Sequence, residues 1–195
     1  MNVELSSMCK RVGLLVGASL LSGVCYAQDA GPKYTYIEGG YTAIDIDDFD
    51  EDGDLWGVGG SVALTDMLFL TGDFASGDVG DVDLTQAFVG LGLNIALNDT
   101  TDFVAEAGVA YAEVEFGPFD EDDEGLGLSA GVRSMITPQF ELNGGISYVD
   151  IADDDETALY AGAVYSFTDM FAGTLGVSFG DDATSYGIGV RLYLN

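Results

Sequence analysis

The sequence has no histidine, and its only two cysteines, Cys9 and Cys25, lie in the first 27 residues. Without histidine the chain cannot build serine-histidine or cysteine-histidine nucleophiles, and the usual zinc sites are excluded as well. A pair of carboxylates could still act as acid and base, but carboxylates are so common here that the proximity of two means little. We therefore predict a protein that is not an enzyme, with no catalytic residue and no required cofactor.

Basic residues and long apolar runs are also scarce. Five Lys plus Arg stand against 34 Asp plus Glu, which gives a net charge of −29. Such a surface repels nucleic acid, so no nucleic-acid partner is expected. No stretch is apolar for the roughly 20 residues that a membrane helix needs, and no later stretch has helical periodicity. The 28 glycines and the many tyrosines and phenylalanines argue for a folded domain rather than disorder.

The first residues have the features of an export signal. Lys10 and Arg11 precede the short apolar run "VGLLVGASLL" and a small-residue exit. We predict a cleaved signal peptide over 1–27 and a single domain over 28–195, which then contains no cysteine. The alternative is a lipoprotein cut before Cys25, although Val24 stands where such signals usually place glycine or alanine.

Alternation of apolar and polar residues with period two recurs through the rest of the chain, and turn residues interrupt it regularly. Tight connections alternate with acidic ones such as "GPFDEDDE" (117–124). In an up-and-down sheet alternate connections lie at opposite ends, so the acidic ones should gather at one end. The predicted strands are 34–46, 54–64, 68–77, 83–97, 102–116, 125–136, 140–150, 157–167, 171–179 and 185–194.

We predict an all-β fold: an antiparallel, up-and-down transmembrane β-barrel of ten strands, or eight as a fallback, with short periplasmic turns and longer acidic extracellular loops. Alternation alone does not separate this from a soluble barrel. The less apolar face, however, is mostly glycine, alanine and serine, as in a cramped interior. The apolar face carries aromatic residues near both strand ends, as expected at two lipid interfaces. This predicted aromatic girdle comprises Tyr41, Trp56, Phe74, Tyr111, Tyr148, Phe179 and Tyr186 at the acidic end, and Phe103, Phe140, Phe167 and Phe171 at the other.

The last strand, "SYGIGVRLYLN", has the glycine and leucine spacing of the terminal signal that barrel-assembly machinery reads, with Asn195 in place of the usual aromatic residue. We expect contact with that machinery during biogenesis, and with outer-membrane lipid and lipopolysaccharide afterwards. The expected protein is a monomer in the outer membrane of a Gram-negative cell, reached after export.

Three stretches resemble a family of small outer-membrane β-barrels of the OmpA/OmpX type, once described as secreted signalling or immune-eliciting factors. They are "YTYIEGGY" (34–41), "LWGVGGSVALTD" (55–66) and "GVRSMITPQFELNGGISYVD" (131–150). The resemblance implies the barrel fold and the outer membrane, and it brings no catalytic residue. It also allows a role as an adhesin or a vesicle-borne secreted signal, which is one alternative to a structural or cell-surface role.

Six charged residues have inward parity and can form one layer across the lumen: Glu38, Asp73, Glu106, Arg133, Glu141 and Arg191. Glu38 and Arg191 lie on the first and last strands, so we predict that they meet across the closing seam. Arg133 should meet Glu106 or Glu141. The layer is interpreted as a structural ion-pair plug, and the alternative is a narrow cation-preferring channel lined by the surplus carboxylates.

The stretch "DFDEDGD" (48–54) matches the first half of an EF-hand loop. The second half fails, because Trp56 and Gly59 occupy ligand positions and the flanks are strands. Two interpretations of the acidic end remain: plain solvation, or a weak Ca²⁺ or Mg²⁺ patch shared by several connections. The candidate ligands are Asp48, Asp50, Asp52, Asp120, Asp122, Asp123, Asp153, Asp154 and Asp155.

Overall fold

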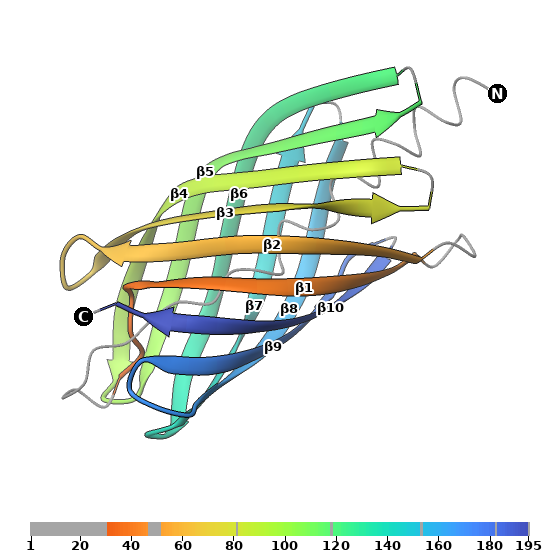
Figure 1. Ribbon diagram of the computed structural model, residues 1–195. Helices are drawn as coiled ribbons and strands as arrows, with labels where there is room; N and C mark the ends of the chain where they lie inside the picture. The colour runs from red at the N-terminus through yellow and green to blue at the C-terminus, as the bar shows by residue number, and fades with distance from the viewer. Residues whose placement is uncertain are drawn as a thin grey trace.

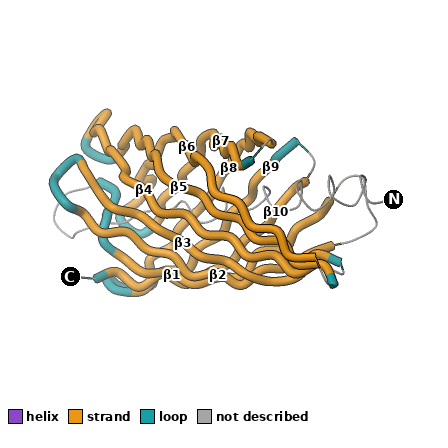
Figure 2. The backbone as a smooth tube through the Cα atoms, turned by 90° about the horizontal axis from the view of Figure 1, so that it is seen from above, coloured by secondary structure: helices purple, strands orange, loops and turns teal. Residues whose placement is uncertain are grey.

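A computed structural model describes residues 31–46, 52–80, 82–117, 119–152, 154–181 and 183–194. The predicted signal peptide lies outside the described residues, as do Asp48, Asp50 and Asp153 from the predicted metal patch. Nearly all of the described backbone is strand (Figure 2). Among these residues no helix combines the length and the apolar character needed to cross a bilayer.

The strands form one closed antiparallel barrel in which each pairs with its neighbours in sequence, and β1 pairs with β10 to close it (Figure 1). The prediction of a ten-stranded up-and-down barrel is confirmed. The strands are β1 (Tyr36–Ile46), β2 (Asp52–Ala63), β3 (Leu68–Val79), β4 (Val82–Asn98), β5 (Thr101–Phe116), β6 (Phe119–Thr137), β7 (Phe140–Ile151), β8 (Asp154–Ser166), β9 (Phe171–Phe179) and β10 (Ala183–Tyr193).

Where the structure describes them, the acidic segments are mostly strand, so the prediction of longer acidic loops is wrong for most of them. The largest difference is β6, which begins at Phe119 and not at 125, leaving only residues 117 and 118 between it and β5. Gly80 and Gly117 take positive φ angles of 60°, which glycine adopts at no steric cost and which tight turns require. The hydrogen-bonded pairing of neighbouring strands thus extends into acidic residues that have low strand propensity.

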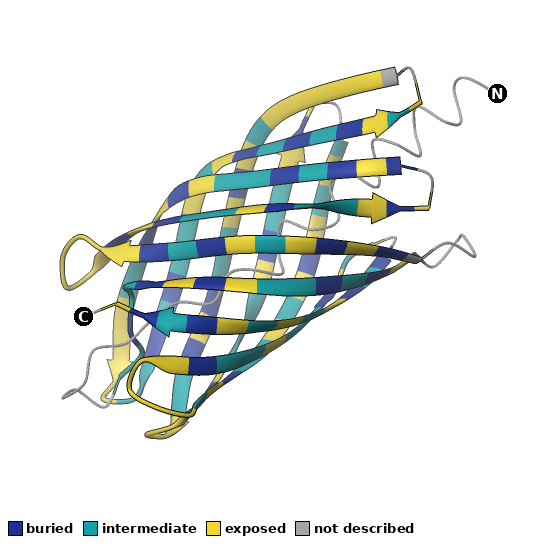
Figure 3. Ribbon diagram, in the orientation of Figure 1, coloured by how far each residue is buried: buried dark blue, intermediate teal, exposed yellow. Residues whose placement is uncertain are grey.

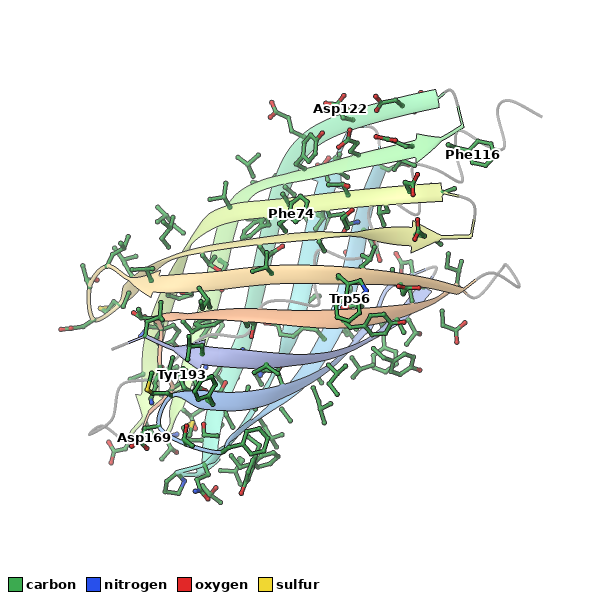
Figure 4. All side chains as sticks on the ribbon, viewed as in Figure 1. Trp56, Phe74, Phe116, Asp122, Asp169 and Tyr193 are labelled. Atoms are coloured by element: carbon green, nitrogen blue, oxygen red, sulfur yellow. The ribbon has the colours of Figure 1, made fainter. Side chains whose placement is uncertain are left out.

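The two ends of the barrel differ in the residues that form them. We call the end with the connections after β1, β3, β5, β7 and β9 the acidic end, and the other the tight-turn end. Figure 4 shows Phe116 and Asp122 at the acidic end, and Asp169 and Tyr193 at the tight-turn end. The first strand begins at Tyr36 and not at 34 as predicted, because residues 31–35 turn into the tight-turn end of the barrel.

Buried and exposed residues alternate along the strands (Figure 3), and the kind of residue on each face changes along the length of the barrel. Over the middle of the barrel apolar residues such as Val58, Val89 and Leu91 point outward and are more than half exposed. Beyond Tyr41 and Trp56, toward the acidic end, acids point outward and apolar side chains point inward. Leu55 and Leu84, each 1% exposed, belong to this inner cluster. The barrel therefore has a lipid-type segment followed by a segment built like a soluble barrel.

Candidate functional site

Two buried ion pairs, each between adjacent strands, lie inside the barrel near the tight-turn end. Arg191, which is 0% exposed, donates from Nε and Nη2 to Oε2 of Glu38 at 2.9 and 2.6 Å. The two residues are direct register partners on β10 and β1, so the predicted contact across the closing seam is present. This pair ties together the first and last strands of the barrel.

The second pair joins β6 to β7. Arg133 donates from Nε to Oε1 of Glu141 at 2.8 Å and from Nη2 to Oε2 at 2.7 Å, a two-pronged geometry that suits the flat guanidinium. Of the two predicted partners, Glu141 is the one that pairs. Glu141 lies one diagonal step from Arg133 in the register, whereas Glu106 lies opposite Ser129, farther along β6. Both members of the pair are buried.

Each of the three basic residues after position 27 lies over a tyrosine ring. The distances to the ring centres are 4.3 Å from Arg191 to Tyr36, 5.0 Å from Arg133 to Tyr34 and 4.5 Å from Lys33 to Tyr193. Cation-π attraction is strongest where water is excluded. The tight-turn end thus combines every base of the domain with a layer of aromatic rings.

Residues 31–35 lie across the lumen at this end. The Tyr34 hydroxyl donates to Asp102 Oδ2 at 2.8 Å, and its ring stacks on Phe69 with centres 4.9 Å apart. Burial raises the pKa of Tyr34 well above its ordinary value, so the phenol stays protonated and keeps donating. Lys33 reaches the backbone oxygen of Asp169 at 3.3 Å. We call residues 31–35 the N-terminal stopper.

The other two predicted lumen charges, Asp73 and Glu106, face the interior but lie outside both ion pairs. Glu106 accepts a hydrogen bond from Ser129 Oγ at 3.3 Å. Neither carboxylate pairs with a base in the part of the chain that the structure describes. The predicted single layer of six is therefore two ion pairs with two further carboxylates nearer mid-barrel.

Aromatic rings fill the middle of the lumen above inward-facing glycines. A methyl group on Gly108 or Gly127 would lie 2.8 Å from the ring of Phe88, and one on Gly145 would lie 2.7 Å from the Tyr160 hydroxyl. These glycines are needed because the rings occupy the space of their missing side chains. The cavity beside Glu38 and Tyr160 has only about 40 Å³, which is room for very few waters.

Apolar side chains pack inside the barrel at the acidic end. The inner cluster draws residues from β1, β2, β3, β4, β5 and β10, and its members are Ile44, Ile46, Leu55, Ala75, Val79, Val82, Leu84, Val114 and Ala183. Sequence reasoning missed this cluster because it assigned the apolar parity of every strand to lipid. The signal was available, since acids replace the outward apolar residues at these strand ends.

Outside this cluster, acidic residues form a row across five adjacent strands. Asp54 on β2 lies opposite Asp78, which lies opposite Asp83, then Glu115 and Asp120 on β6. All five are exposed. Like charges directly opposite each other destabilise a sheet. We call these five residues the acidic row.

Three carboxylates, from Glu113, Glu115 and Asp120, have oxygens within 4.8 Å of one another. Of the predicted metal ligands that the structure describes, only Asp120 belongs to this group. Asp122 and Asp123 lie on β6, and Asp154 and Asp155 on β8. Metal binding stays a prediction, because exposed acids often gather without an ion.

The predicted girdle residues that lie on strands have outward register, with Tyr41 against Trp56 at 5.1 Å between ring centres. Trp56 is 67% exposed. Tyr165, which the sequence prediction omitted, joins Phe167 at the tight-turn end at 5.3 Å. The lumen tyrosines Tyr36 and Tyr193 were also missed, although they share the parity of Glu38 and Arg191. Aromatic residues near strand ends thus lie on both the outer face and the lumen face of the barrel.

The sequence profile of the family described as "Outer membrane protein beta-barrel domain" matches residues 14–167. The chain belongs to this family. Both the fold and the family are those of outer-membrane β-barrels. Export by a signal peptide stays a prediction. No relative among curated proteins matches the chain significantly.

Solved structures with a similar fold include three outer-membrane proteins. OprG from Pseudomonas aeruginosa is 15% identical with a TM-score of 0.48, and the match covers 86% of this chain and 100% of OprG. The NanC porin is 12% identical with a TM-score of 0.47, covering 82% and 100%. The KdgM porin is 9% identical with a TM-score of 0.46, covering 83% and 99%. Likeness at this level says nothing about substrate or function.

Proposed function

We propose that this protein is a closed outer-membrane barrel that serves a structural or cell-surface interaction role and catalyses no reaction. The observation that carries the proposal is the filled interior. The N-terminal stopper, two buried ion pairs, mid-lumen rings and the inner apolar cluster follow one another from the tight-turn end to the acidic end. A barrel whose lumen is occupied in this way acts through its outer surfaces.

The surface that supports an interaction role is the acidic row. Its direct like-charge pairing costs stability, and cations or a cationic partner would offset that cost. A polycationic surface, or divalent ions that bridge to anionic lipopolysaccharide, would do this. The proposed partners are therefore cationic groups outside the membrane.

Planar-bilayer recording of the refolded protein tests the closed lumen. We expect a silent membrane, because the ion pairs and the stopper occupy the lumen at the tight-turn end. A variant with Tyr34→Ala and Lys33→Ala removes two stopper side chains and should give intermittent openings. Steady, ion-selective openings of the unaltered protein would overturn the closed-barrel proposal.

Binding of proteoliposomes to polylysine-coated beads tests the surface role. The variant Asp78→Asn with Glu115→Gln should bind several-fold less than the unaltered protein. The matched control is Asp73→Asn with Glu106→Gln, which removes carboxylates from the lumen and should bind normally. Equal loss in both variants would mean that total charge, and not the acidic row, determines binding.

A narrow cation-preferring channel is the second candidate, and one observation favours it. Asp73 and Glu106 face the lumen without a basic partner among the described residues, and lumen carboxylates select cations in channels. If the unaltered protein conducts, Asp73→Asn with Glu106→Gln should lower its preference for cations. Unchanged selectivity in that variant would remove this candidate.

A further inference from the structure

The outer wall of the barrel is hollowed on one side. A groove of about 820 Å³ lies over β8, β9, β10, β1 and β2. Gly39 on β1 and Gly173 on β9 form its low floor, with Val190 of β10 between them in the register. The volume lies within the roughly 300–1,000 Å³ of sites that hold small molecules.

Aromatic pairs stand at both ends of the groove. Tyr41 and Trp56 border it toward the acidic end, and Tyr165 and Phe167 border it toward the tight-turn end. These pairs belong to the two rings that mark the lipid interfaces, so the groove crosses the apolar band of the barrel. Among the residues that the structure describes, none that lines the groove is charged at neutral pH.

We propose that this groove binds one acyl chain of an outer-leaflet lipid, with the lipid headgroup beside Tyr41 and Trp56. The indole and phenol can donate hydrogen bonds at the interface, where such side chains place their polar ends. A linear chain lying over Gly39 and Gly173 then replaces the side chains that these positions lack. The site is separate from the lumen and does not depend on whether the barrel conducts.

A second copy of the barrel fits the groove less well than a lipid does. A symmetric dimer would place one hollow against another, which leaves both unfilled, because an isologous contact joins the same patch on each copy. A flexible acyl chain has no such restriction. The outward position between the two girdles therefore favours membrane lipid as the occupant.

Trp56 gives a direct readout, because it is the single tryptophan in the sequence and lines the groove. Phosphatidylcholine with brominated acyl chains is titrated into the folded protein in detergent micelles, and quenching of tryptophan fluorescence is followed. We expect saturable quenching at a low mole fraction of lipid. Native mass spectrometry should find one retained lipid per barrel.

Gly39→Leu fills the floor of the groove. A β-carbon at this position would meet only a backbone oxygen at 3.6 Å, an ordinary contact, so the barrel should still fold. Since each lost methylene contact weakens burial, the quenching midpoint should shift about tenfold toward higher lipid. Ala107→Leu on β5, also exposed and outward, is the matched control and should keep the normal midpoint. Heat-modifiable gel migration checks that both variants are folded.

The outcomes separate the possible occupants. A shift of the quenching midpoint by about tenfold in Gly39→Leu, with the normal midpoint in Ala107→Leu, supports the acyl-chain site. Equal midpoints in all three proteins would overturn it, since ordinary surrounding lipid would then explain the quenching. A dimer mass that Gly39→Leu abolishes, without retained lipid, would also overturn it in favour of a second copy.

Discussion

The barrel contains two segments with opposite hydrophobic order along the same strands. In the lipid-type segment apolar side chains such as Val89 point outward, and the charges of Glu38 and Arg191 point inward. In the acidic segment Asp83 points outward and Leu84 points inward. The change occurs near Tyr41 and Trp56, the pair at the expected lipid interface.

The difference shows that the medium around the barrel determines which side chains point outward. Where lipid surrounds the barrel, charged side chains point inward, and both buried arginines there are paired with a glutamate. Where water surrounds it, apolar residues gain more by filling the lumen. One hairpin such as β4 and β5 satisfies both demands by exchanging its faces along its length.

The largest expected effect comes from breaking the seam ion pair in the lipid-type segment. Arg191→Met leaves the Glu38 carboxylate buried without its guanidinium, and should lower the free energy of unfolding by about 3–5 kcal/mol. Urea titration of the barrel in lipid vesicles measures this. Adding Glu38→Gln to the same variant should recover part of the loss, because no uncompensated charge then remains. If Arg191→Met alone lowers the free energy of unfolding by less than about 1 kcal/mol, the pair has no structural role.

Truncating leucines in the two segments compares an inner core with a lipid-facing wall. Leu55→Ala opens a cavity in the inner apolar cluster and should lower the free energy of unfolding by about 2–5 kcal/mol. Leu91→Ala, on the exposed face of the lipid-type segment, should cost less, because lipid can fill the space. Urea midpoints of the two variants give the comparison. Equal losses would mean that the inner cluster is not packed like a core.

Outward lysines should also distinguish the two segments. Val89→Lys places a charge on the lipid face and should cost about 2–4 kcal/mol if it lies near the bilayer midplane. Asp83→Lys, on the same outward parity of β4, should cost nothing, because it faces water and relieves like-charge contacts. The folded fraction after insertion into vesicles measures both. A severe loss for Asp83→Lys would place that part of the wall in lipid.

The smallest effect is expected from neutralising one member of the acidic row. Asp78→Asn removes the repulsion from Asp54 and Asp83 and should raise the stability by about 0.2–1 kcal/mol. The gain should shrink at high ionic strength, because salt screens exposed charges. Urea titrations at low and high salt measure it. A loss of stability would instead indicate that Asp78 makes a favourable contact, such as one with a bound cation.

Much of this structure could be predicted from periodicity alone. The strand count and the Glu38–Arg191 contact follow from alternation and from the rule that the first and last strands close a barrel. The lengths of the acidic strands could not be predicted in this way, because residues 119–124 have low strand propensity and pair only through the ladder that β5 provides. Strand propensity depends on the residue itself, whereas pairing depends on the neighbouring strand, so propensity alone does not predict where these strands end.

The interior shows a second limit of sequence reasoning. Parity places Tyr36 and Tyr193 inside, but aromatic residues near strand ends also suggest a girdle, and the two indications conflict. Lys33 and Tyr34 were predicted neither as lumen residues nor as a stopper, because their inward position depends on contacts with Asp102, Phe69 and Tyr193 on other strands. No local pattern reports such contacts.

Labelling of single cysteines along β4 tests the exchange of faces and the filled lumen together. The domain after residue 27 has no cysteine, so each introduced thiol is unique. With a water-soluble maleimide on the folded barrel in vesicles, we expect Asp83→Cys to react quickly, and Leu84→Cys and Val89→Cys to react slowly. Val89→Cys alone should react with a lipid-soluble reagent. Rapid aqueous labelling of Leu84→Cys would contradict the closed barrel, because it would show water where the inner cluster should exclude it.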